Sequence, residues 1–229
     1  MAFKSLDDFK KAAILSGIME IETSDMQFLL DEKGLNSLLF TEPFSKLCFT
    51  CSAVSEFLRH GNVIYIDLDT AFTSYVRNGI FTFTADGNDL LIYLPSANSF
   101  EEILADICSR INSDVELVVM DSINSFYHLY NGIKIGSLNH LLISYISLLL
   151  NHASKSGSRL LVTSMRRHRK TTEWVLVPAS KRLIESKSKV ILTADLSDGN
   201  LLVNLVKHGT LKSDSKKFLL AQKQIPIAI

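Results

Sequence analysis

The sequence predicts an α/β fold in which helices cover both faces of a mostly parallel β-sheet. In the first two-thirds of the chain, strand-like and helix-like segments alternate, and the strand-like segments are apolar throughout. Strands without a polar face belong in a sheet that is buried on both sides. The last third changes to successive strand-like segments joined by turns such as residues 197–200. This change predicts an antiparallel C-terminal extension at one edge of the sheet.

The opening segment predicts a helix, because Ser5 and Asp8 resemble a capping box before an apolar face that ends near Gly17. This helix, within residues 1–20, is a candidate oligomerisation segment that precedes a core domain of residues 21–229. The next predicted elements are a helix at 25–32, a strand at 37–41, a helix at 45–59 and a strand at 63–67.

Past residue 80, short unbroken apolar runs predict strands, and longer segments between them predict helices. The predicted elements are a strand at 88–93, a helix at 99–111, a strand at 117–120, a helix at 137–154 and a strand at 159–163. Four further strands are predicted at 173–177, 189–194, 201–207 and 217–221. Because no helix separates these last strands, they favour the antiparallel edge.

Composition excludes several classes of function. The 24 basic and 24 acidic residues cancel, so a nucleic-acid contact would have to be a local patch. Three cysteines do not build a disulfide framework and no secretory signal opens the chain, which predicts a cytoplasmic protein. The longest apolar stretch, residues 141–150, is about half the length that spans a bilayer, so no membrane association is expected.

One segment has the setting of a phosphate-binding loop without its chemistry. Residues 38–49 read as an apolar strand, a short turn and the start of an apolar helix. A working loop reads G-x-x-x-x-G-K-[ST], so that backbone N–H groups, the lysine and the hydroxyl hold phosphates and Mg²⁺. Its two glycines, its lysine and its hydroxyl residue are replaced by Thr41, Lys46, Leu47 and Cys48. Phe44 obstructs phosphate further, although a register slip would offer Lys46 as the phosphate-binding lysine.

Five fragments follow one another in the order of a known family. They are residues 22–35, 63–72 (V-I-Y-I-D-L-D-T-A-F), 115–123 (V-E-L-V-V-M-D-S-I), 159–165 (R-L-L-V-T-S-M) and 201–209. Together with the loop at 41–48, the chain resembles the RecA/RadA/KaiC superfamily core, and specifically an archaeal-type RadA paralog with a degenerate Walker A loop. The resemblance implies a RecA-like fold.

The resemblance also implies that the ATPase site is vestigial. The family's catalytic glutamate falls on Asp69, one methylene shorter; the Walker B aspartate is kept as Asp121; and the sensor glutamine falls on Met165, which cannot donate a hydrogen bond. We therefore expect no hydrolysis, no catalytic residue and no cofactor, with weak ATP and Mg²⁺ binding as the alternative. No metal site is expected: Asp67 and Asp69 face one side of their strand, either as a cation site or, more simply, as a remnant of the ATPase site.

A basic cluster follows the strand predicted at 159–163. It consists of Arg166, Arg167, His168, Arg169 and Lys170, with Trp174 shortly after. Cations neutralise nucleic-acid phosphates, and an indole ring stacks on a base. In relatives the loop after this strand contacts single-stranded DNA, so these residues are candidate nucleic-acid ligands. The alternative is a solvated charged turn with Trp174 packed at the start of a strand.

Two short motifs complete the set of candidates. Phe9 and Ala12 form F-x-x-A, which resembles the motif by which RadA-type proteins insert a phenylalanine into a neighbouring subunit; the alternative is intramolecular packing. Cys48 and Cys51 have the spacing of a redox motif, but they lie in an apolar helix and are predicted to be buried hydrophobes.

The leading hypothesis is a non-catalytic accessory factor in DNA recombination or repair. It would bind a RadA-type recombinase or a RecA-like paralog, as a homo- or hetero-oligomer, together with single-stranded DNA. One alternative is a structural subunit of a RecA-like ring that binds RNA, as the Elongator subunits bind tRNA. Another is a KaiC-like signalling module with vestigial nucleotide binding.

Overall fold

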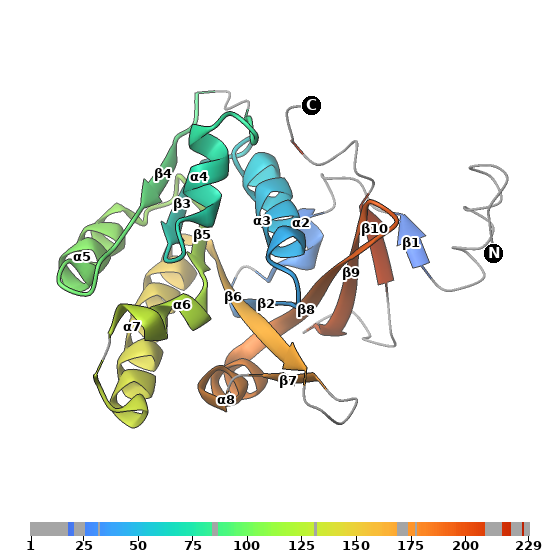
Figure 1. Cartoon of the computed structure of the whole chain (residues 1–229). Coiled ribbons are helices and arrows are strands. Elements are labelled where there is room, and N and C mark those ends of the chain that lie inside the picture. Colours follow the sequence, from blue (N-terminus) through green and yellow to red (C-terminus); the bar gives the residue numbers. More distant parts are fainter. Residues whose placement is uncertain are drawn as a thin grey trace, which may run out of the picture.

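A single ten-stranded sheet organises the chain in the computed structural model (Figure 1). The structure describes residues 18–20, 26–31, 33–83, 87–130, 132–168, 174–176, 178–208, 217–220 and 226. The strands are β1 (Ile18–Glu20), β2 (Leu35–Phe40), β3 (Asn62–Asp67), β4 (Leu90–Tyr93), β5 (Val115–Asp121), β6 (Arg159–His168), β7 (Trp174–Leu176), β8 (Ser188–Ser197), β9 (Asn200–Lys207) and β10 (Lys217–Leu220). The helices are α2 (Met26–Leu29), α3 (Pro43–Phe57), α4 (Ala71–Arg77), α5 (Phe100–Arg110), α6 (Ile123–Leu129), α7 (Ile135–Ser156) and α8 (Pro178–Lys187).

The sheet is parallel at its centre and antiparallel toward one edge. Its order is β1-β10-β9-β8-β2-β6-β5-β3-β4, with β7 paired to β6. All strands from β8 to β4 along this path run parallel, whereas β9 is antiparallel to β8 and β10 is antiparallel to β9. The predicted α/β class with an antiparallel C-terminal extension is confirmed. The strand predicted at 189–194 differs in one respect: it pairs in parallel with β2, so the extension begins only at β9.

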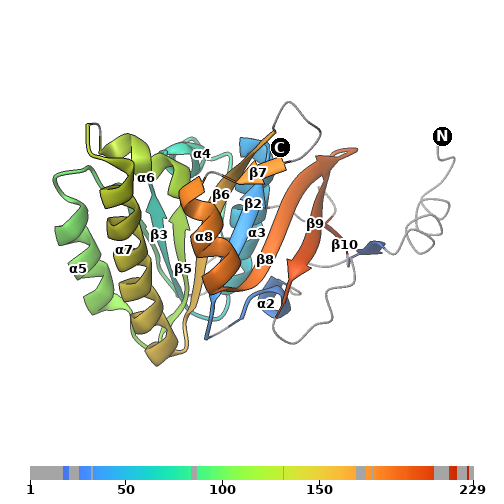
Figure 2. The same cartoon turned by 90° about the horizontal axis from the view of Figure 1, so that it is seen from below.

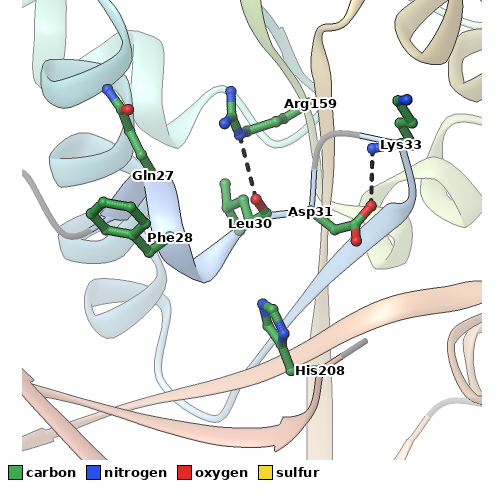
Figure 3. A pocket seen from close by; sticks show the side chains of 7 residues that line it. All are labelled: Gln27, Phe28, Leu30, Asp31, Lys33, Arg159 and His208. Carbon is green, nitrogen blue, oxygen red and sulfur yellow. Dashed lines mark hydrogen bonds between the residues drawn. The ribbon is translucent and has the colours of Figure 1, made fainter. Parts of the chain in front are cut away.

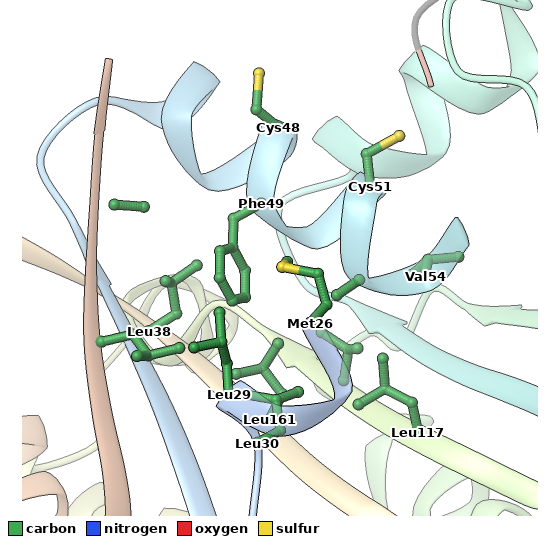
Figure 4. Close-up of a cluster of buried hydrophobic side chains, with 14 of the residues drawn as sticks. Met26, Leu29, Leu30, Leu38, Cys48, Phe49, Cys51, Val54, Leu117 and Leu161 are labelled. Atoms are coloured by element: carbon green, nitrogen blue, oxygen red, sulfur yellow. The ribbon is translucent and has the colours of Figure 1, made fainter. Parts of the chain in front are cut away.

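Two large hydrophobic cores, one on each face, explain why the central strands are mostly apolar. Leu117 and Leu161 join the core beneath α2, α3 and α4 (Figure 4), whereas their neighbours Val118 and Leu160 join the core beneath α5, α6 and α7. Figure 2 shows these two layers of helices on opposite sides of the sheet. Successive residues of a strand point to opposite faces, so a strand buried on both faces is apolar at most positions.

Several elements differ from the predictions. Helices α4, α6 and α8 and strand β1 were not expected, and α3 begins two residues earlier than predicted, at Pro43. Strand β6 runs to His168 instead of ending at residue 163, because β2 and β7 pair with its polar end. The helix predicted within residues 1–20, with Phe9 and Ala12, lies outside the described residues. Among the helices of the described ranges, none is long and apolar enough to cross a membrane.

Thr70, directly before α4, lies in the left-handed region with φ 63° and ψ 2°. A side chain with a Cβ costs about 1–2 kcal/mol in this conformation, and glycine does not incur that cost. Thr70 is a β-branched residue, so it adopts this left-handed conformation at a cost. The turn sets the position of Asp69, the residue before it.

We expect Thr70→Gly to stabilise the protein by about 0.5–1 kcal/mol, because relief of the left-handed strain exceeds the added chain entropy of glycine. The free energy of unfolding in urea is the measurement. Gly79→Ala is the matched control, since Gly79 has φ 67° and open space around an added Cβ, and it should lose about 1 kcal/mol. A loss of stability for Thr70→Gly would contradict the prediction.

Candidate functional site

Four charged residues meet at the carboxyl edge of the parallel strands. Asp67 ends β3, Asp121 ends β5, and the two are opposite each other in the register of these strands. Asp69 follows β3 by two residues, and Lys46 comes from the first turns of α3. In open α/β sheets, ligands bind outside the carboxyl ends of the strands. This edge is therefore the candidate functional site.

The ammonium group of Lys46 lies between two carboxylates. Its Nζ is 2.7 Å from Asp69 Oδ2 and 2.9 Å from Asp121 Oδ2. The Lys46 side chain is 1% exposed and that of Asp121 is 0% exposed. Burial by itself would lower the pKa of Lys46, but the neighbouring Asp121 and Asp69 carboxylates outweigh it and the pKa is raised. Lys46 is therefore a charged, buried residue that is held by two acids.

Asp121 is satisfied on both of its oxygens. The Tyr65 hydroxyl donates to Oδ2 at 2.6 Å, and the Thr163 hydroxyl donates to Oδ1. Tyr65 is itself fixed by stacking on Phe72, with ring centroids 3.9 Å apart. Burial, followed by the charge of Asp121, raises the pKa of Tyr65 well above its usual value, so this hydroxyl remains a donor. Asp121 is thus part of a network in which both of its carboxylate oxygens have partners.

Asp67 is a third buried carboxylate beside this network. Its Oδ2 accepts hydrogen bonds from the backbone N–H of Thr73 at 2.7 Å and from the Thr73 hydroxyl at 2.6 Å. Its Oδ1 is buried and has no hydrogen-bond partner among the described residues. Burial raises the pKa of Asp67 to about 6, although the bonds from Thr73 oppose this rise. Oxygens of Asp67, Asp69 and Asp121 all lie within 4.8 Å of one another.

The segment 41–48 is mostly helical. Only Thr41 and Glu42 form the turn between β2 and α3, and the Lys46 N–H already donates within the helix to the Glu42 carbonyl. Thr41 donates through its hydroxyl to Asp195 Oδ1 at 3.0 Å. The Phe44 side chain is 41% exposed at the start of α3.

The side chains of α3 divide between the core and the site. Leu47 and Cys48, which the sequence comparison aligned with the lysine and the hydroxyl residue of a phosphate-binding loop, are buried in the hydrophobic core. Lys46, aligned with the second glycine, reaches the site and contacts Asp69 and Asp121. The sequence offered Lys46 as a phosphate-binding lysine through a register slip, but in the structure its ammonium is bound by these two carboxylates.

The two cysteines of α3 are packing residues. Cys48 and Cys51 are both free and buried, as predicted. Burial raises the pKa of the Cys48 thiol to about 11 and raises that of Cys51 as well. A thiol that stays protonated is a poor nucleophile, so redox chemistry has no support at this position.

The basic cluster begins inside a strand, which corrects its predicted position after a strand end. Arg166, Arg167 and His168 belong to β6 and pair in antiparallel register with β7, where His168 is opposite Trp174. Arg169 and Lys170 lie outside the described residues. Met165, the residue before this cluster, pairs with Phe40 and donates its backbone N–H to Asn124 Oδ1 at 2.6 Å. The sequence did contain a signal for this pairing, because β7 lies within the strand predicted at 173–177.

A hollow of about 460 Å³ lies at the amino ends of the parallel strands, beside the start of β6 (Figure 3). It is lined by Gln27, Phe28, Leu30, Asp31, Lys33, Arg159 and His208. The Arg159 guanidinium donates to the Leu30 carbonyl at 3.4 Å and to Glu116 Oε2 at 3.3 Å, and it lies over the Phe57 ring. Nothing in the sequence indicated this hollow, which lies at the other end of the strands from Asp67 and Asp121.

Comparison with known proteins identifies the fold. No family model matches the chain, and no curated protein matches it. Among solved structures, the chain is similar to the crystal structure of the RadB recombinase, with a TM-score of 0.61 and 15% sequence identity. The match covers 87% of this chain and 96% of that one. At this level of identity the similarity shows the fold alone, and it confirms the predicted RecA-like α/β fold.

We expect Asp67→Asn to stabilise the protein increasingly as the pH rises from about 4 to 7. Asp67 has a raised pKa of about 6, so the folded state holds its proton more tightly than the unfolded state, and stability is lost as the carboxyl ionises. The gain should approach about 3 kcal/mol above pH 7, measured by urea unfolding at several pH values. Asp114→Asn, at an exposed turn, is the matched control. A gain that does not change with pH would contradict the prediction.

Proposed function

We propose that this chain is a non-hydrolysing RecA-like accessory protein of DNA recombination or repair. In this proposal it binds a RecA-family recombinase or paralog and contacts single-stranded DNA through the β6–β7 hairpin. The observation that carries the proposal is the position of the Lys46 ammonium, 2.7 Å from Asp69 and 2.9 Å from Asp121.

The ion pairs of Lys46 are incompatible with a working ATPase site. Phosphoryl transfer needs one carboxylate to orient the attacking water and others to hold Mg²⁺, and these groups must be accessible to the nucleotide. Here the two corresponding carboxylates already share a buried cation. Entry of Mg²⁺ and ATP would require Lys46 to leave a position in which its side chain is 1% exposed. The start of α3 at Pro43 leaves no long loop whose N–H groups would surround a phosphate.

The hairpin supports the nucleic-acid part of the proposal. It extends β6 beyond the carboxyl edge, and Arg166, Arg167 and His168 lie on it in a chain whose formal net charge is zero. A local cluster of cations on a neutral protein favours a specific polyanion contact over general electrostatic attraction. The similarity to a recombinase fold agrees with a partner of the same family.

We expect the purified protein to release no phosphate from ATP and to show no shift of its melting temperature with ATP and Mg²⁺. The physical reason is that the Lys46 ammonium occupies the cation position between Asp69 and Asp121. Phosphate release and thermal unfolding are the two measurements. A melting shift that is abolished by Asp121→Ala would instead favour the KaiC-like alternative.

We expect the quadruple Arg166, Arg167, Arg169 and Lys170 to Gln variant to bind single-stranded DNA at least about tenfold more weakly. Its affinity should also depend less on salt, by about 0.7 in the log–log slope for each DNA phosphate that the variant no longer neutralises. The matched control removes four cations near the C-terminal ends of α3, α4, α5 and α7: Arg59, Arg77, Arg110 and Lys155. Equal affinity and slope in both variants would refute the role of the hairpin.

The partner and the type of nucleic acid are tested together. Co-purification of the tagged protein from its host should recover a RecA-family recombinase or paralog, and the pure protein should prefer single-stranded DNA over tRNA. Preference for tRNA, with ring-forming RecA-like subunits in the pull-down, would support the Elongator-like alternative.

A further inference from the structure

The carboxylates around Lys46 have the composition of a metal site. Asp67, Asp69 and Asp121 each bring an oxygen to within 4.8 Å of the other two. Asp67 and Asp121 are buried, while the Asp69 side chain is 29% exposed and opens the cluster to solvent. Carboxylate oxygens are the ligands of hard cations, and a single exposed ligand would provide the entry path.

The three oxygens are close enough together for one hard cation to contact all of them. Ca²⁺ accepts carboxylate oxygens in a flexible geometry, whereas Mg²⁺ demands a near-ideal octahedron and gives up its water reluctantly. An ion of the Ca²⁺ class is therefore the better candidate for these three acids.

A second observation, on Asp67, points to a missing cation. Asp67 is 1% exposed, and its Oδ1 has no hydrogen-bond partner within the described ranges. The ion pairs of Lys46 go to Asp69 and Asp121. An ammonium group therefore compensates a cluster of three carboxylates, and a buried acceptor beside it is unsatisfied, which carries a substantial desolvation penalty.

We propose that Lys46 is a tethered cation seated in a latent metal site, and that removal of its charge turns Asp67, Asp69 and Asp121 into a binding site for an ion of the Ca²⁺ class. The inference rests on the proposed function in one respect, namely that Lys46 closes this edge of the sheet. Beyond that, it assigns a metal site to these three acids, which the Lys46 side chain fills in the wild-type protein.

The test uses Lys46→Gln, which removes the charge but keeps a hydrogen-bond donor. Saturating Ca²⁺ should raise the melting temperature of this variant by about 5–10 °C and leave the wild type unchanged. Tb³⁺ should bind with a stoichiometry of one and emit when tyrosine is excited, because the Tyr65 hydroxyl is 2.6 Å from Asp121 Oδ2. Excess Ca²⁺ should remove this emission.

Two double variants locate the ion. Tyr65→Phe in the Lys46→Gln background should weaken the Tb³⁺ emission without preventing the Ca²⁺ effect on melting. Asp67→Asn in the same background should reduce both signals at least tenfold at fixed metal concentration. A Lys46→Gln protein that is folded, yet indifferent to Ca²⁺ and Tb³⁺, would overturn the proposal.

Folding provides a second measurement if Lys46→Gln does not accumulate. Lys46→Ala and Lys46→Gln are then refolded from urea with Ca²⁺ or with a chelator, and the proposal requires a folded yield that depends on Ca²⁺. Equal yields, or no folded protein in either condition, would overturn it. The ATP and DNA experiments use variants that keep Lys46, so failure of the metal site and failure of the proposed function are separate results.

Discussion

The buried ion pairs of Lys46 are the interaction on which the carboxyl edge of the sheet depends. They join the first turns of α3 to the ends of β3 and β5, and through Asp121 they connect with Tyr65 and with Thr163 on β6. Removal of one partner from a buried ion pair typically costs about 3–5 kcal/mol, because the remaining charge is left uncompensated. Charge and packing are therefore coupled here: the helix that carries Lys46 also places Leu47 and Cys48 in the core.

The RecA-like fold brings these groups together through its parallel sheet. Strand β6 begins at Arg159 beside the hollow at one edge, donates to Asp121 from Thr163, and ends in the hairpin with Arg166. One uninterrupted strand thus joins the closed carboxylate cluster to the basic hairpin. In the proposed function, this edge is closed to nucleotide by a cation that the chain itself supplies, the Lys46 ammonium.

The central fold could be predicted because its signal is local. Strands β3 and β5 each contain a short apolar run rich in β-branched residues and bounded by polar ones, which favours a buried strand over a helix. The polar end of β6 was missed because its extended conformation depends on pairing with β2 and β7, which hold Met165 and Arg166 in the sheet. The residues of the segment by themselves do not indicate that pairing. Helix α4 has only seven residues and follows a left-handed Thr70, so its periodicity is too short to detect.

The site was predictable only in part, for a similar reason. The resemblance grouped Asp69 and Asp121 in one site, and the structure brings both residues to the carboxyl edge of the sheet, where Lys46 contacts them. The ion pairs of Lys46 depend on the rotation of α3, which is set by where the helix begins, and the unpartnered oxygen of Asp67 depends on Thr73 of another element. Such relations arise from tertiary packing, and no motif records them.

The division of α3 between core and site has a consequence for protein engineering. A phosphate-binding loop at residues 41–48 would require glycine at 41 and 46, lysine at 47 and a hydroxyl at 48. Glycine at 46 alone would remove the cation from the carboxylates, and lysine at 47 alone would put a charge where Leu47 is 3% exposed. A nucleotide site could therefore be built at this edge only by changing several residues of α3 together.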